Sequence, residues 1–249
     1  MVENTDGTRY EYETNLESGS MQNRADDSGA VILFLHGWGG DLRSFAGIYS
    51  EVCGWGFKAV NLSFPPVVPP QWGVYDYAAY VHAFLKLKGI RDPVIVGHSF
   101  GGRVGIILAS QGVCSKLVLV DSAGARPKFS LAKKIKIARY KRRVKLGKPL
   151  DGFGSIDYNN VGKEMRGVFV RIVNTHLDKL LPYIKCPTLV FWGERDKDTP
   201  PYMARRIARK VKRCELVMTD GGHYSYIDCK YKFLRSLRSF ISDGADLRS

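Results

Sequence analysis

Residues 93–102 read PVIVGHSFGG and join a predicted strand to a predicted helix through a short glycine-rich turn. Pro93–Gly97 is apolar without alternation, which is typical of a short buried strand, and Gly101–Gln111 continues as an apolar helix. Between them lies a G-x-S-x-G motif centred on Ser99. So tight a strand-turn-helix connection strains the serine backbone and admits only small neighbours. We therefore expect the Ser99 hydroxyl to stand clear of the sheet edge, where the helix N-terminus favours developing negative charge.

Strand-like and helix-like segments alternate on both sides of this turn. The expected strands are Ala30–Leu35, Lys58–Leu62, Pro93–Gly97, Lys116–Val120, Thr188–Trp192 and Glu215–Met218. The expected helices are Leu42–Cys53, Val74–Lys88, Gly101–Gln111, Pro201–Lys212 and Asp228–Ile241. Thr8–Leu16 alternates loosely, which indicates an edge strand, and a polar loop over Glu17–Gly29 follows it. The alternation predicts an α/β protein with a mostly parallel sheet flanked by helices.

This alternation stops in the middle of the chain. Residues 124–182 show no strand pattern and contain a basic run, a Gly-rich stretch and several polar residues. We interpret residues 126–182 as a helical cap, inserted into an α/β core that consists of residues 1–125 and 183–249. A chain of 249 residues is long enough for one such domain with a full hydrophobic core.

Most of the net charge of +14 belongs to this insertion. Eleven basic residues and no acid lie between Arg126 and Lys148, so the rest of the chain carries only +3. A solvated helix face is the plainer interpretation. The alternative is a surface that attracts an anionic substrate, an acidic carrier protein or a membrane surface, because clustered charge accelerates association with acidic partners. Nucleic acid is disfavoured as a partner, since no known binding module accompanies the charge.

The composition excludes several classes of protein. With 45% hydrophobic and 25% charged residues, the chain is neither disordered nor collagen-like. No apolar run reaches the ~18 residues that span a bilayer, and the N-terminus lacks the apolar core of a secretion signal. The five cysteines show no C-x-x-C spacing, which indicates free thiols and disfavours a zinc site. We therefore expect a cytoplasmic protein with no transmembrane segment and no bound metal.

A serine hydroxyl is a useful nucleophile only when an oriented base takes its proton. His223 follows the last expected strand in a Gly-Gly-His turn and is the candidate base. Asp196 follows the preceding strand in the segment WGERD and is the candidate acid, and the order serine, acid, histidine suits three residues at one sheet edge. Asp198 could take the acid's role after a small shift of the loop. Asp121 is a third candidate, although a turn or cap residue is the plainer interpretation there.

The segment HGWGG at residues 36–40 follows the first buried strand and completes the candidate site. Its backbone can present an N–H group to an oxyanion, together with the N–H of the residue after the nucleophile. We choose the backbone N–H groups of Trp38 and Phe100 as these two donors. His36 and His98 flank the site, and we expect both to make structural hydrogen bonds.

Four motifs together resemble the α/β-hydrolase superfamily, namely HGWGG at 36–40, GHSFGG at 97–102, WGERDKDTP at 192–200 and GGH at 221–223. The resemblance covers about Ala30–Ala125 and Lys185–Ile241, and the block between them matches a cap domain only in position. It implies an α/β-hydrolase fold, with a mostly parallel sheet flanked by helices and a helical cap insertion.

The resemblance also implies a carboxylic ester hydrolase that acts by two-step acyl transfer on a small-molecule acyl substrate, without a metal or an organic cofactor. Ser99 would attack the carbonyl carbon with His223 as base, Asp196 would hold the imidazole, and water would release the acyl-enzyme. We expect the cap to form an apolar acyl pocket with loops that contain Trp38, Trp72 and Phe64–Pro70.

Because one scaffold serves many reactions, two alternatives stay open. The first is a carbon–carbon bond hydrolase that uses the same triad on a diketone-like substrate. The second is a hydrolase-fold receptor that binds a ligand or a partner protein without turnover. A serine at this turn disfavours dehalogenase and epoxide-hydrolase chemistry, for which related enzymes use a carboxylate nucleophile.

Overall fold

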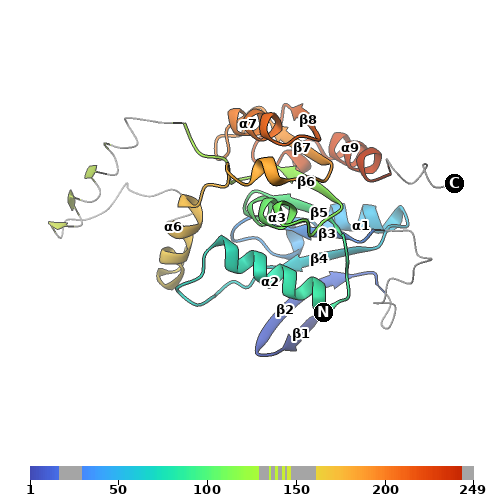
Figure 1. Ribbon diagram of the computed structural model, residues 1–249, viewed down its shortest axis with the longest axis horizontal. Coiled ribbons are helices and arrows are strands. Elements are labelled where there is room, and N and C mark those ends of the chain that lie inside the picture. Colours follow the sequence, from blue (N-terminus) through green and yellow to red (C-terminus); the bar gives the residue numbers. More distant parts are fainter. Residues whose placement is uncertain are drawn as a thin grey trace.

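The computed structural model describes residues 1–16, 30–128, 135, 138–139, 142–143, 145–146 and 161–242. Within them one sheet of eight strands has the order β1-β2-β4-β3-β5-β6-β7-β8 (Figure 1). The strands are β1 Val2–Thr5, β2 Thr8–Thr14, β3 Ile32–Leu35, β4 Ala59–Ser63, β5 Val94–His98, β6 Lys116–Val120, β7 Thr188–Gly193 and β8 Cys214–Thr219. The strands from β3 to β8 pair in parallel, and only the pairs β1–β2 and β2–β4 are antiparallel. The expected loop over residues 17–29 lies outside the described residues.

Helices cover both faces of this sheet (Figure 1). The α-helices are α1 Ala46–Gly54, α2 Val74–Leu87, α3 Phe100–Ser110, α6 Arg166–Asn174, α7 Tyr202–Lys210, α8 Ser225–Asp228 and α9 Lys230–Ser242. Alternate residues of each strand point to opposite faces, so Leu33 and Leu35 pack with α2, α3 and α7, whereas Ile32 and Phe34 pack with α1, α8 and α9. In the part of the chain that the structure describes, no helix is long and apolar enough to cross a membrane.

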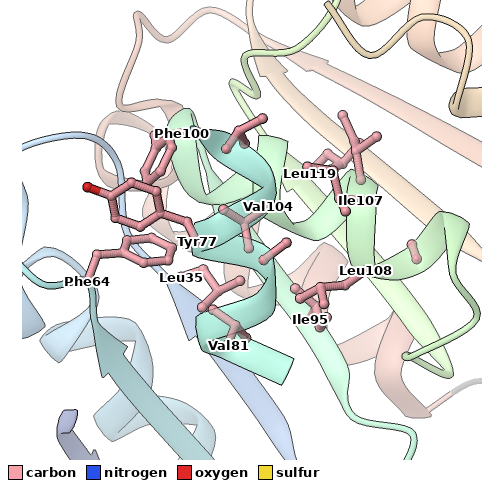
Figure 2. Close-up of a cluster of buried hydrophobic side chains, with 14 of the residues drawn as sticks. Leu35, Phe64, Tyr77, Val81, Ile95, Phe100, Val104, Ile107, Leu108 and Leu119 are labelled. Atoms are coloured by element: carbon pink, nitrogen blue, oxygen red, sulfur yellow. The ribbon is translucent and has the colours of Figure 1, made fainter. Parts of the chain in front are cut away.

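The layer formed by α2 and α3 carries the core that supports the nucleophile turn. Figure 2 shows aliphatic side chains of α3 packed against β5 and β6, and aromatic rings gathered at the end of α3 where Ser99 begins it. The ring of Phe100 lies 5.0 Å from those of Phe64 and Tyr77, in edge-on contacts. Since all three side chains are buried, this contact fixes the start of α3 against α2.

The parallel register places the candidate site at one edge of the sheet. The strands β3, β5, β6, β7 and β8 all run in the same direction, so their carboxyl ends lie side by side. The loops that follow these ends contain, in order, His36–Gly40, Ser99, Asp121, Asp196 and His223. Five segments that are far apart in the sequence therefore meet at this edge, which is where ligands bind in open α/β sheets.

The turn at Ser99 is as tight as its sequence predicts. Ser99 has φ 49° and ψ −106°, and its backbone N–H donates to the carbonyl of Val120 over 3.0 Å. A Cβ atom at Gly97 would lie 2.6 Å from the backbone of Gly101, and one at Gly101 would overlap the carbonyl oxygen of Leu35. The turn therefore exists only because glycines lie on both sides of the serine.

The N-terminal segment differs from the expectation. The predicted edge strand over Thr8–Leu16 is observed as β2, but it is not at an edge, because β1 pairs with its outer side. The two strands are joined by Asp6 and Gly7, which have φ values of 50° and 74°. Asp-Gly with both φ values positive is the usual two-residue turn of a β-hairpin, so this pair was the signal for β1.

The predicted cap over residues 126–182 is described mainly at 126–128 and 161–182. Its described part includes α6, which buries Val168, Phe169 and Ile172 in the core on the α2–α3 side. Arg171 ties α6 to the proline-rich loop by donating to the carbonyls of Pro70 and Trp72 over 2.9 Å and 2.6 Å. The domain boundaries, and the partners expected from a basic run that lies largely outside the described residues, stay predictions.

Substitution of Gly101 by alanine tests the contact between α3 and β3. The new Cβ would overlap the Leu35 carbonyl, so we expect Gly101→Ala to lower the free energy of unfolding by about 3 kcal/mol or more. Gly167→Ala in α6 is the matched control, because an alanine Cβ there meets nothing within 4 Å and should raise stability by about 0.5–1 kcal/mol. Urea unfolding of both variants measures this difference, and equal stabilities would contradict it.

Candidate active site

The side chains of Ser99, His223 and Asp196 form a continuous hydrogen-bonded row. The imidazole Nε2 of His223 lies 3.0 Å from the Ser99 Oγ, and its Nδ1 lies 2.9 Å from the Asp196 Oδ2. The Asp196 side chain is fully buried, whereas the His223 ring keeps 15% of its surface exposed. The structure thus brings together the three residues predicted from the sequence, at the hydrogen-bond distances that a nucleophile, a base and an acid would require.

Asp196 is held in place by its own loop. Its Oδ1 accepts hydrogen bonds from the backbone N–H groups of Asp198, at 2.8 Å, and Thr199, at 2.9 Å. The Thr199 hydroxyl lies 2.6 Å from Oδ2 of Asp196 and 2.9 Å from the carbonyl oxygen of Asp121. The motif analysis did not identify Thr199, although an aspartate that bonds backbone N–H groups two and three residues ahead is a familiar turn. This turn aims one carboxylate oxygen at the imidazole.

Asp198, the alternative acid, lies at the mouth of the site. Its side chain is exposed, and among the described residues His223 hydrogen-bonds to Asp196 rather than to Asp198. Ligand atoms of Asp196, Asp198 and His223 lie within 4.8 Å of one another, a spacing that a metal ion could bridge. However, both oxygens of Asp196 already accept hydrogen bonds, and the other nitrogen of His223 faces Ser99. The donor set therefore fits a hydrogen-bonded triad better than a cation site.

Asp121, the third candidate acid, hydrogen-bonds to the backbone of two other segments. Its Oδ1 accepts from the backbone N–H of Gly193 at 2.8 Å, and its Oδ2 accepts from that of Ser225 at 2.9 Å. Burial raises the pKa of its carboxyl group to about 7. Asp121 therefore connects the end of β7 with the start of α8, on either side of His223, instead of binding the imidazole.

His36 and His98 hydrogen-bond to the backbone around the site. Nε2 of His98 lies 2.7 Å from the carbonyl oxygen of His223, and burial lowers the pKa of His98 to about 3. The neutral ring must therefore donate its Nε2–H to this carbonyl. In His36 the roles are reversed, because Nε2 accepts from the N–H of Phe64 at 3.0 Å, and Nδ1–H then donates to the Gly37 carbonyl at 2.7 Å.

The two predicted oxyanion donors lie beside the nucleophile. Trp38 and Phe100 line a cavity of about 220 Å³ together with Ser99 and His223. Among the described residues, the backbone N–H groups of Trp38 and Phe100 have no acceptor. The N–H of Phe100 belongs to the first residue of α3, where such groups are unpaired within the helix. Their role as oxyanion donors stays a prediction.

A second cavity of about 420 Å³ adjoins the first. It is lined by the turn at residues 36–40, by Phe64–Pro66 and Tyr77, and by Val161 and Met165 from the insertion. Trp38 and Phe100 line both cavities, so the two spaces lie next to each other. Of the residues expected around an acyl group, Trp38 and Phe64–Pro66 line this cavity, whereas Trp72 packs on Tyr77 at 5.2 Å between ring centres.

The charges around His223 favour its protonated form. Burial acts to lower the pKa of the imidazole, but the hydrogen bond to Asp196 and the charges of Asp196, Asp198 and Asp121 outweigh it and raise the pKa above its ordinary value. Burial likewise acts to raise the pKa of Asp196, and the hydrogen bonds from His223 and Thr199 bring it below its ordinary value. Asp196 is therefore ionised when the imidazole takes up a proton.

A parallel sheet with a serine turn, a histidine and an aspartate at its carboxyl edge is the arrangement of the α/β-hydrolase fold. The chain matches the alpha/beta hydrolase family over residues 32–230, and it belongs to this family. It is 26% identical to Lipase 1 of Psychrobacter immobilis over 249 aligned residues, which cover 84% of this chain and 78% of the lipase. It is 25% identical to the AB hydrolase superfamily protein YisY of Bacillus subtilis, over 85% of this chain and 91% of that protein. The esterase EaEST of Exiguobacterium antarcticum shares the fold, with a TM-score of 0.74 and 18% identity over 97% of this chain and 98% of the esterase.

Titration of His223 distinguishes between the two candidate acids. In the wild-type protein we expect its pKa above the ordinary 6.5, and Asp196→Asn should lower it because the hydrogen-bonded carboxylate is lost. Asp198→Asn should lower it less, since Asp198 acts on the imidazole only through its charge. NMR of the imidazole across a pH series measures all three values. A larger shift in Asp198→Asn than in Asp196→Asn would assign the acid to Asp198.

Proposed function

We propose that this protein is a serine hydrolase that cleaves a carboxylic ester, or a close acyl relative, through an acyl-enzyme on Ser99. The observation that carries the proposal is the row Ser99–His223–Asp196, with hydrogen-bond distances of 3.0 Å and 2.9 Å. The similarity to a protein named as a lipase supports ester chemistry over other reactions of the family.

In the first step the Ser99 Oγ attacks the ester carbonyl carbon while Nε2 of His223 takes its proton. The ionised Asp196 stabilises the resulting imidazolium and keeps Nδ1 protonated, which leaves Nε2 free to act as the base. The backbone N–H groups of Trp38 and Phe100 donate to the negative carbonyl oxygen, and one such donor contributes about 3 kcal/mol to transition-state stabilisation.

The tetrahedral intermediate then collapses. The imidazolium of His223 returns the proton to the leaving alkoxide, which departs as an alcohol, and the acyl group stays on Ser99. Water attacks this ester in the second step, again with His223 as base, and releases the carboxylic acid and the free serine. The scheme is complete without a metal or an organic cofactor, because oxygen nucleophiles and proton transfers account for every bond.

The cavities favour a small-molecule acyl substrate. The cavity beside Ser99 has about 220 Å³, and the aromatic cavity that shares Trp38 and Phe100 with it has about 420 Å³. We assign the acyl group to the cavity that Ser99 lines, and the leaving group to the larger cavity, which meets the first at Trp38 and Phe100, the residues that carry the two N–H donors.

Replacement of Ser99 tests this function. We expect Ser99→Ala to reduce the turnover of short p-nitrophenyl esters by about 10⁴-fold or more, since no other group can carry the acyl intermediate. A fluorophosphonate probe should label the wild type at Ser99 and leave the variant unlabelled. Ser110→Ala, at the opposite end of α3, is the control and should retain full activity.

Full activity in Ser99→Ala would overturn the mechanism. Labelling of Ser99 without ester turnover, combined with cleavage of a diketone, would favour carbon–carbon bond hydrolysis. A protein that neither reacts with the probe nor turns over any ester would instead be a binding protein with this fold.

A further inference from the structure

A buried cation lines the same cavity as the nucleophile. Arg103 follows Ser99 by one turn of α3 and is only 7% exposed. Its side chain and those of Ser99 and His223 line the cavity of about 220 Å³. A buried guanidinium is costly unless it is paired, so its surroundings should show what it is paired with.

The partners of Arg103 in the protein satisfy only part of its hydrogen-bonding capacity. Nη1 donates to the carbonyl of Thr175, and Nη2 donates to that of Val173 at 3.4 Å. Both carbonyls belong to the C-terminal end of α6, whose dipole favours a cation. A guanidinium has five N–H donors, and for the remaining three no acceptor exists among the described residues.

No carboxylate of the described residues forms an ion pair with Arg103. Burial lowers the pKa of its guanidinium to about 10, so it remains protonated at neutral pH. The N-terminus of α3, which also carries partial positive charge, lies one turn away. Asp198 lines the same cavity, but it is exposed at the mouth beside His223. The buried part of the cavity is therefore electropositive.

The two hydrogen bonds from Arg103 cap the C-terminal end of α6, but this role does not explain why the residue is an arginine, which is always charged. Two carbonyl acceptors need only neutral donors, and a cation without an ion pair loses its hydration on burial. A carboxylate in the cavity would accept from the N–H groups of the guanidinium that have no acceptor among the described residues, and this ion pair would compensate for the hydration lost on burial.

We propose that Arg103 binds a carboxylate on the acyl part of the substrate, so that the preferred substrates are monoesters of short dicarboxylic acids. The inference rests on the proposed function, because it places the ester carbonyl at Ser99 and the carboxylate in the same cavity. A volume of about 220 Å³ is below that of most ligand pockets, which limits the acyl chain to a few carbon atoms.

The test compares two esters that differ in one charge, mono-4-nitrophenyl glutarate and its methyl-capped neutral diester. The wild type should show a kcat/KM about 10-fold or more higher for the glutarate monoester. Arg103→Met should lose this preference, with a fall in kcat/KM that is 10- to 100-fold larger for the anionic ester than for the neutral one and that arises mainly through KM. Arg103→Lys keeps the charge and should restore part of the preference.

Arg205→Met, an exposed position on α7, is the control for loss of a cation and should keep the wild-type preference. Free glutarate should raise the melting temperature of the wild type and not that of Arg103→Met. If Arg103→Met does not fold, Arg103→Lys replaces it in both comparisons. An equal loss on both esters, or a wild type without a preference, would reduce Arg103 to a structural role and overturn the proposal. Failure of the proposed function is distinct, because it would appear as loss of fluorophosphonate labelling at Ser99.

Discussion

The backbone of Ser99 is held at a φ of 49° because α3 begins closer to β3 than a side chain would allow. Such a conformation costs about 1–3 kcal/mol and persists only where the surroundings impose it. Here the N–H of Ser99 donates to Val120 at 3.0 Å, its carbonyl accepts from Ala123 at 3.0 Å, and the N–H of Gly101 donates to His36 at 3.1 Å. The backbone at the ends of the two neighbouring strands, β3 and β6, thus fixes Ser99 and the first turn of α3.

The imidazole of His223 is positioned by a second set of contacts that is independent of Ser99. Asp121 accepts from the backbone N–H of Gly193, at the end of β7, and from that of Ser225, two residues after His223, and His98 donates to the carbonyl of His223 at 2.7 Å. The Thr199 hydroxyl lies between the Asp121 carbonyl and the Asp196 carboxylate. The loops after β5, β6, β7 and β8 therefore hold one another, and the ring needs little reorganisation to receive a proton.

Much of this arrangement could be predicted from local sequence, and the features that could not be predicted have a physical reason. The glycines around Ser99 and the alternation of strands and helices are strong signals, because each depends on sterics or burial within a few residues. The segment Val2–Thr5 is short and half exposed, so its pairing was visible only in the Asp-Gly turn that follows. Asp121 acts through hydrogen bonds between separate loops, which no local pattern encodes, whereas Thr199 bonds Asp196 within its own loop and Asp121 across loops.

Arg103 in α3 is another residue whose role could not be predicted from local sequence, because its partners are far away in the chain. In the sequence it interrupts an apolar helix. Its acceptors at residues 173 and 175 belong to the insertion, for which the sequence predicted helices but not their positions. Once placed, it gives the site two electrostatic ends, an acidic one at Asp196 and Asp198 around the base and a cationic one at Arg103. A substrate with its carboxylate near Asp198 is repelled, and the reversed substrate is attracted. In the proposed reaction, the carboxylates that raise the pKa of His223 would thus also orient an anionic ester.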